Sequence, residues 1–152
     1  MIRLFLFVSL FISVALTGCQ SSENNELLDA SAMGDTSKIE LALKRGANLN
    51  TRDSDHGATP VIVAIWAGQL HAVKLLIQNG ADQNLFGAGG TPLYWAAFYG
   101  RTEIFLFLKS QGAKLNVDDK SFAYLLQIIH EKGLADLIVE VKDQTQEQDR
   151  RY

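Results

Sequence analysis

A short segment of this chain occurs twice in nearly the same form, and this repetition constrains the fold more than any other feature. Residues 57–68 read GATPVIVAIWAG, and residues 89–100 read GGTPLYWAAFYG. Twelve residues after each copy ends comes a Gly-Ala pair, in NGADQN and in QGAKLN respectively. A chain that repeats one pattern at a fixed distance is expected to stack similar units against one another.

Two series of glycines give the length of the unit. The first series has steps of 34, 32 and 33 residues and consists of Gly34, Gly68, Gly100 and Gly133. The second has steps of 34 and 32 residues and consists of Gly46, Gly80 and Gly112. Each glycine of the second series begins related text: GANLN, GADQN or GAKLN. A period near 33 residues predicts a solenoid.

Each unit carries signals for two short helices. Thr59 and Thr91 suit the N-cap of a helix, because their hydroxyls can accept from free backbone N–H groups. Pro60 and Pro92, the two prolines of the chain, suit the first helical position, where a missing N–H costs nothing. The glycines of both series can adopt the left-handed conformation that ends a helix.

The second helix of each unit carries the same apolar face. The residues five and eight positions after each glycine of the first series are Ile39, Val73, Phe105 and Ile138, then Ala42, Leu76, Leu108 and Val141. Positions three apart lie on one face of a helix. Stacked copies therefore bury one continuous core, which a single unit could not form.

These features together resemble the ankyrin repeat family. Residues 57–84 and 89–116 carry the resemblance most clearly, residues 27–50 look like a degenerate first repeat, and residues 121–142 look like a closing repeat. The resemblance implies an all-α solenoid of about four helix-turn-helix repeats, with the repeat domain over residues 26–142. Residues 143–152 are expected to form a polar tail.

Two departures from the family pattern concern the starts of helices. The histidine that usually follows Thr-Pro-Leu is replaced by Ile62 and Tyr94, so its hydrogen bond to the threonine is lost and looser turns are expected. The last repeat lacks Thr-Pro and begins with DDKSF. Its first helix is therefore expected to start early or irregularly.

The N-terminal segment has the layout of a secretory signal. Residues 1–18 contain Arg3 and then an uncharged apolar run, shorter than the ~20 residues that a spanning helix needs. The sole cysteine, Cys19, ends the sequence LTGC, which resembles the lipobox of bacterial lipoproteins. The resemblance implies cleavage before Cys19, lipidation of its thiol, and a tether over residues 19–25. The protein is then expected to face the periplasm from the outer membrane. The alternative is an ordinary secreted protein with a cysteine here by chance.

In ankyrin folds, partner contacts come from the turn tips and the inner face of the first helix. Trp66, Phe98 and Tyr99 stand just before the closing glycines, where a structural role would not require large rings, and Met33 occupies a comparable place. Extra core packing and membrane contact are the alternatives for these rings. We expect Tyr94, Trp95 and Phe107 in the core. The predicted partner-binding residues are Asp55, His56, Trp66, Asn79, Phe98, Tyr99 and Gln111.

Other functions find little support in the sequence. The net charge is −3 and no basic run is present, which disfavours nucleic acid as a partner. Asp53, Asp55 and His56 lie close together, but their spacing fits no specific metal motif. No phosphate-binding loop or catalytic triad can be recognised, so no cofactor, metal or small-molecule substrate is expected.

We therefore expect a non-catalytic module that binds another protein. A narrower alternative is an immunity or inhibitor lipoprotein that neutralises a toxin in the envelope. An envelope enzyme is a third possibility, supported only by scattered His and Asp residues.

Overall fold

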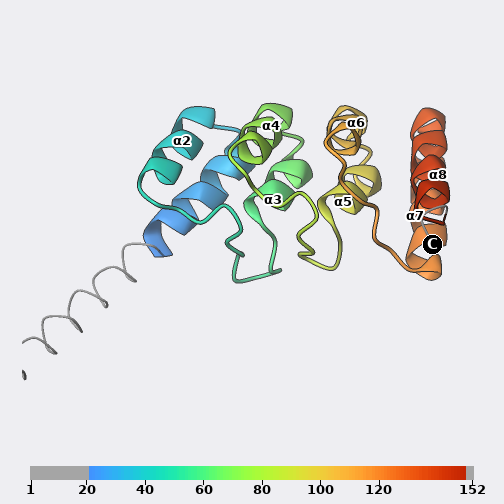
Figure 1. The fold of residues 1–152 in the computed structure, drawn as a ribbon, viewed down its shortest axis with the longest axis horizontal. Helices are drawn as coiled ribbons and strands as arrows, with labels where there is room; N and C mark the ends of the chain where they lie inside the picture. Colours follow the sequence, from blue (N-terminus) through green and yellow to red (C-terminus); the bar gives the residue numbers. More distant parts are fainter. Residues whose placement is uncertain (1–20, 150–152) are drawn as a thin grey trace, which may run out of the picture.

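In the computed structural model, which describes residues 21–149, the chain forms successive helices joined by turns and loops (Figure 1). Residues 21–33 are helical. The further helices are α2 (Thr36–Lys44), α3 (Pro60–Ala67), α4 (Leu70–Gln78), α5 (Pro92–Phe98), α6 (Thr102–Ser110), α7 (Asp119–Glu131) and α8 (Ala135–Asp149). Within the described residues the only strand-type pairing is a bridge between Gly87 and Gly90. The predicted all-α fold is confirmed.

The helices lie in two rows. Helices α3, α5 and α7 contact one another in order and form the inner row, while α2, α4 and α6 form the outer row. Each inner helix also packs against the helix that follows it in the chain. Figure 1 shows the outer row along the top, α3 and α5 below it, and the helical segment of residues 21–33 beside α2. The fold is a stack of four helical pairs.

The helices of the two central repeats begin as predicted. The side chain of Thr59 accepts a hydrogen bond from Ile62 N (3.4 Å), and Thr91 accepts one from Tyr94 N (3.4 Å). Pro60 and Pro92 occupy the first turns of α3 and α5. At the other end of α3, Gly68 has φ 76° and forms a left-handed cap. A residue with a Cβ would be strained in that conformation.

The core runs between neighbouring repeats. Ile39, Val73 and Phe105 are fully buried, and so are their partners three residues later. Ile138, the fourth member of the series, is partly buried and packs against this core. The apolar face that the glycine series predicted is thus the shared interior of the stack.

Asparagine side chains tie successive loops together. Asn50 Oδ1 accepts from Asp82 N of the next repeat (3.0 Å), and Asn84 Oδ1 accepts from Lys114 N of the one after (2.8 Å). These bonds satisfy backbone donors that the loops would otherwise leave unpaired. They give a physical reason for the recurrence of Asn at the end of GANLN and GADQN.

A second set of bonds joins each repeat to the end of the preceding inner helix. Gln69 Nε2 donates to Ala32 O (3.4 Å), and Arg101 Nη2 donates to Trp66 O (2.9 Å). Free carbonyls at the end of a helix need such partners. In the two central repeats, the residue that follows the closing glycine therefore links the repeat to the one before it.

The ends of the chain differ from the expectations in two respects. Residues 21–25, expected within a tether, are helical, and Asn24 Oδ1 accepts from Asn48 N (2.7 Å). Helix α8 continues to Asp149 through most of the polar stretch expected as a tail. The signal segment of residues 1–18 and Cys19 lie outside the described residues.

The closing repeat starts differently from the central ones, as its sequence indicated. Asp118 replaces threonine as the N-cap of α7 and accepts from Ser121 N (2.8 Å). With 13 residues, α7 is longer than α3 (8 residues) and α5 (7 residues).

No helix within residues 21–149 combines the length and the apolar character that crossing a membrane requires.

Candidate functional site

Large aromatic side chains form a continuous strip along the inner row. Neighbouring ring centroids of this set lie 5.2–6.3 Å apart. We call the set the aromatic strip; it consists of Trp66 from α3, Tyr94, Trp95 and Phe98 from α5, Tyr99 at the end of α5, and Tyr124 from α7.

Trp95 is the hub of the strip. Its ring lies 5.5 Å from that of Trp66 and 5.4 Å from that of Phe98, in both cases edge to face. Its indole Nε1 donates to Gly87 O (3.1 Å), which fixes the ring against the adjacent loop. We expected Trp95 in the core; the structure places it only partly against the core. The signal was present in the sequence, because residues three and four apart on a helix meet on one face.

The members of the strip differ in accessibility. Tyr99 is 39% exposed and Tyr124 is 52% exposed. Phe98 is half-buried and packs partly against the core, so it has a structural role beside any contact with a partner. Trp66 is also half-buried, and its indole Nε1 has no hydrogen-bond partner among the described residues. Tyr99 and Tyr124 are the accessible rings of the strip.

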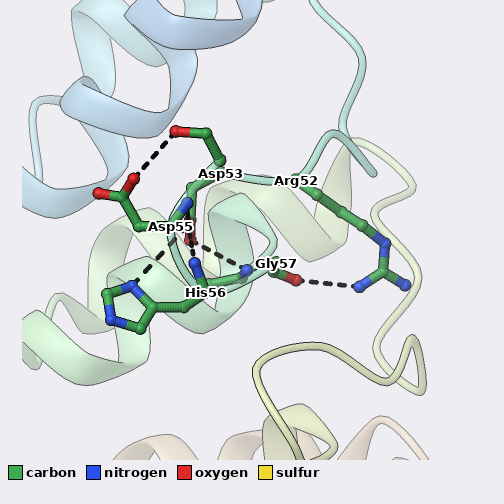
Figure 2. Close-up of polar contacts among 7 residues, drawn as sticks. Arg52, Asp53, Asp55, His56 and Gly57 are labelled. Atoms are coloured by element: carbon green, nitrogen blue, oxygen red, sulfur yellow. Dashed lines mark hydrogen bonds and ion pairs between the residues drawn. The ribbon is translucent and has the colours of Figure 1, made fainter.

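We call the loop before α3, residues 52–58, the first finger, and Figure 2 shows the polar contacts within it. Asp53 organises it: its carboxylate accepts from the backbone N–H groups of Asp55 (2.8 Å), His56 (2.6 Å) and Ala58 (2.9 Å). This arrangement places the exposed ring of His56 5.8 Å from the ring of Trp66. Two predicted site residues, His56 and Trp66, are thus brought into contact.

The hydrogen bonds to Asp53 also determine its charge state. Burial raises the pKa of its carboxyl, but the backbone N–H groups of His56, Ala58 and Asp55 outweigh burial and hold the pKa below its ordinary value. Asp53 is therefore ionised at neutral pH, as the accepting role in the finger requires.

Asp53→Ala is expected to lower the free energy of unfolding by about 1–2 kcal/mol at neutral pH, because three backbone donors lose their acceptor. A carboxyl whose pKa is lowered by folding contributes its full stabilisation of the folded state at pH values above its pKa in the unfolded chain, which is about 4. This contribution is lost as the pH falls through the folded-state pKa. Urea titrations should show that the difference in unfolding free energy between Asp53→Ala and the wild type is smaller at acidic pH than at neutral pH.

The matched control lies in the same finger. Asp55 is exposed and accepts only from Ser54 Oγ (3.1 Å) among the hydrogen bonds found for its carboxylate. Asp55→Ala should change stability by less than about 0.5 kcal/mol. Equal losses in both variants, or a difference for Asp53→Ala that does not vary with pH, would contradict the role assigned to Asp53.

The loop before α5 forms the second finger, residues 86–91, by a different device. Gly87 and Gly90 exchange backbone hydrogen bonds (2.9 and 3.0 Å), with Ala88 and Gly89 between them at φ 53° and 87°. Two central residues with positive φ are typical of a tight type I′ hairpin.

Arg52 joins the two fingers. Its guanidinium donates to Gly57 O of the first finger (2.9 Å) and to Phe86 O of the second (2.7 Å). The fingers are therefore held in register along the strip.

Two predicted site residues lie elsewhere. Asn79 and Gln111 are the C-cap residues of α4 and α6 in the outer row, whereas the strip lies on the inner row. Asn79 Nδ2 donates to Leu75 O of its own helix (2.8 Å). Gln111 O accepts from Gln83 Nε2 of the preceding repeat (2.6 Å). The structure does not bring either residue to the aromatic strip.

The chemistry available at the strip is that of a binding surface. Exposed ring faces and finger side chains can stack, pack and donate hydrogen bonds. Within residues 21–149 no group of three or more His, Cys, Asp or Glu side chains is placed to hold a metal ion.

Comparison with known proteins identifies the repeats. The family model described as ankyrin repeats (3 copies) matches residues 27–119. The chain belongs to the ankyrin repeat family. Helix α7 begins at Asp119, the last residue of the match, and α8 follows it. The two helices continue the same stack as a fourth pair. Ankyrin repeats are generally protein–protein interaction modules, and the family is typically non-catalytic.

Relatives with similar repeats occur in animals and bacteria. Ankyrin repeat domain-containing protein 63 of Mus musculus is 32% identical over 100 residues, covering 62% of this chain and 25% of that protein. An ankyrin repeat protein of Borreliella burgdorferi is 32% identical over 94 residues, covering 60% and 42%. Protein PhlB of Serratia liquefaciens is 38% identical over 75 residues, covering 49% and 33%. The chain thus spans less than half the length of each of these relatives.

Proposed function

We propose that this ankyrin protein captures another protein through the aromatic strip and the two fingers. The observation that carries the proposal is the continuity of the strip across three inner helices, with Tyr99 and Tyr124 accessible at its surface. Small and aliphatic side chains such as Ala96 and Leu125 already fill the core. Core packing therefore does not explain why Tyr99 and Tyr124 are large rings at the surface.

The physical support comes from the energetics of interfaces. Tyrosine and tryptophan are enriched among residues whose truncation weakens protein complexes by about 2 kcal/mol or more. Rings bury much area while losing few rotatable bonds. Because their neighbours already restrict the rings of the strip, a partner would order few additional side chains on binding.

We further propose that the module is held at the bacterial envelope by lipid on Cys19, facing the periplasm from the outer membrane. The support is the sequence LTGC at the end of an apolar segment, containing the only cysteine of the chain. Two or more acyl chains give stable anchoring where one is marginal. Cys19→Ser should leave the precursor uncleaved and lipid-free; a processed, membrane-bound Cys19→Ser protein would contradict the anchor.

The capture proposal is tested with the double variant Tyr99→Ala/Tyr124→Ala. After chemical cross-linking in cells, we expect recovery of the partner to fall at least about tenfold, since each lost ring contributes of the order of 1 kcal/mol or more. The matched control is Leu41→Ala/Leu106→Ala, which removes two similarly exposed apolar side chains from the outer row.

Either of two results would contradict the proposal. Full recovery of the partner by the strip variant would show that the rings do not bind it. An equal loss in the control would place the contact on the outer row. If the partner recovered is a toxin, the protein acts as its inhibitor.

A further inference from the structure

The helical segment of residues 21–33 runs in the same direction as α3. Its last turn lies beside the end of α3, because Gln69 Nε2, two residues after that helix, donates to Ala32 O (3.4 Å). Its first turn lies beside the loop that leads to the first finger, because Asn48 N donates to Asn24 Oδ1 (2.7 Å). The segment therefore starts on the side of the stack where α3 and α5 also start, directly after the two fingers. We call this the finger side.

The chain between this start and the proposed lipid is short. Glu26 pairs with Arg45 of the same repeat (3.1 Å), so the segment is held to its repeat from its first turns. Cys19 precedes residue 21 by two positions, and two residues span at most about 7 Å. A lipid on Cys19 therefore brings the bilayer to the finger side of the first repeat. The opposite side lies about 20 Å away, the length of a helix of 13 residues.

The second finger carries an apolar side chain on the finger side. Phe86 is 54% exposed, and among the exposed large hydrophobic side chains within residues 21–149 it is the one that lies in a finger. Its carbonyl accepts from Arg52 Nη2 (2.7 Å), and the hairpin of Gly87 and Gly90 follows it, so its backbone is already held in place. Residues 83–91 contain no charged side chain. The ring of Phe86 can therefore be buried without burying a charge of the same finger.

We infer, on the basis of the proposed lipid anchor, that the finger side rests on the membrane and that Phe86 enters the boundary between headgroups and acyl chains. The anchor makes this second contact intramolecular, so a single ring can be sufficient. The exposed charges of this side are mixed, with Asp55 against Lys114 and Lys120, so the contact should depend little on salt. Tyr99, at the end of α5, lies on the opposite side and stays accessible to a protein partner.

The test uses the processed, lipidated protein in vesicles of phosphatidylethanolamine and phosphatidylglycerol. Mass spectrometry first establishes whether Cys19 carries lipid. Because Cys19 is the only cysteine of the chain, its lipidation leaves an introduced cysteine as the one thiol that a dye can label. Ser54→Cys places an environment-sensitive dye on the first finger. Ser37→Cys is the matched control, because this serine is also exposed but lies in the first turn of α2, on the opposite side.

We expect nitroxide-labelled lipids to quench the dye on the first finger and to leave the dye on α2 unquenched. A nitroxide near the headgroups should quench more than one near the chain ends, because interfacial segments reach only about 5–10 Å into the boundary. Adding Phe86→Ser to Ser54→Cys should reduce the quenching at least about twofold, since the docked state loses a buried ring. Leu106→Ser, which removes a similarly exposed side chain from the outer row, should leave the quenching unchanged.

Several outcomes would overturn the inference. With lipid present on Cys19, equal quenching of both dyes or quenching of neither would leave the anchor intact and reject the orientation. Quenching that survives Phe86→Ser would show that the tether alone orients the stack and would reject the contact of Phe86. Disulfide-linked dimers of unlabelled Ser54→Cys on the vesicles would assign the finger side to a second copy of this chain.

The proposed functions are judged separately from this contact. Absence of lipid on Cys19 would overturn the anchor and the inference together. Capture of a protein partner would still depend on whether Tyr99→Ala/Tyr124→Ala loses that partner in cells.

Discussion

Phe105→Ala is expected to lower the free energy of unfolding by about 3–5 kcal/mol. Phe105 lies on α6, is fully buried, and belongs to the core shared by neighbouring repeats. Truncating it removes apolar contacts and leaves a cavity that the surrounding helices can fill only in part. Urea denaturation followed by far-UV circular dichroism measures the loss.

The adjacent residue provides the control for this substitution. Leu106 lies on the same helix but is 43% exposed, so Leu106→Ala should cost less than about 1 kcal/mol. Similar losses in the two variants would mean that α6 does not bury the face assigned to it. The stacked core would then have to be abandoned.

Gly87→Ala is expected to destabilise the protein by about 1–3 kcal/mol, the cost typical of an over-packed site. A Cβ at this position would lie 2.9 Å from Gly57 O and 2.9 Å from Ile62 Cδ1. The first neighbour is backbone, so relief requires the two fingers to separate. That separation would weaken the bonds of Arg52 that hold the fingers together. Thermal unfolding monitored by circular dichroism measures the change.

Gly89→Asn controls for the loss of a glycine in the same hairpin. A Cβ at Gly89 meets nothing within 4 Å, and asparagine tolerates positive φ better than most residues. Its effect should stay below about 1 kcal/mol. If Gly89→Asn proved as damaging as Gly87→Ala, the cost would come from hairpin flexibility rather than from contact between fingers.

Most of the fold could be predicted from the sequence because each repeat carries local signals at a fixed spacing. Thr59 and Pro60 start a helix by mechanisms that involve only nearby backbone. The period of the glycines then places Val73 and Phe105 on equivalent faces, whatever the exact geometry of the stack. The loss of the usual histidine at Ile62 and Tyr94 did not prevent threonine capping, since the threonine oxygen acts alone.

The site was harder to predict because it depends on contacts between repeats. The helical pattern predicts Trp95 in the core, yet its contacts with Trp66 are set by the distance between α3 and α5. Asn79 and Gln111 vary between copies, but variation alone does not distinguish the inner row from the outer row. The structural role of Asp53 was not predicted; several backbone donors around one Asp are an Asx-type turn, which DSDHG could have suggested.

The most direct test of the aromatic strip as the partner-binding surface is site-specific photocross-linking in living cells. A benzophenone amino acid placed at Tyr99 should form one discrete protein adduct. The same group at Leu106, similarly exposed but on the outer row, should form none. Adducts of equal yield at both positions, or an adduct only at Leu106, would contradict the account.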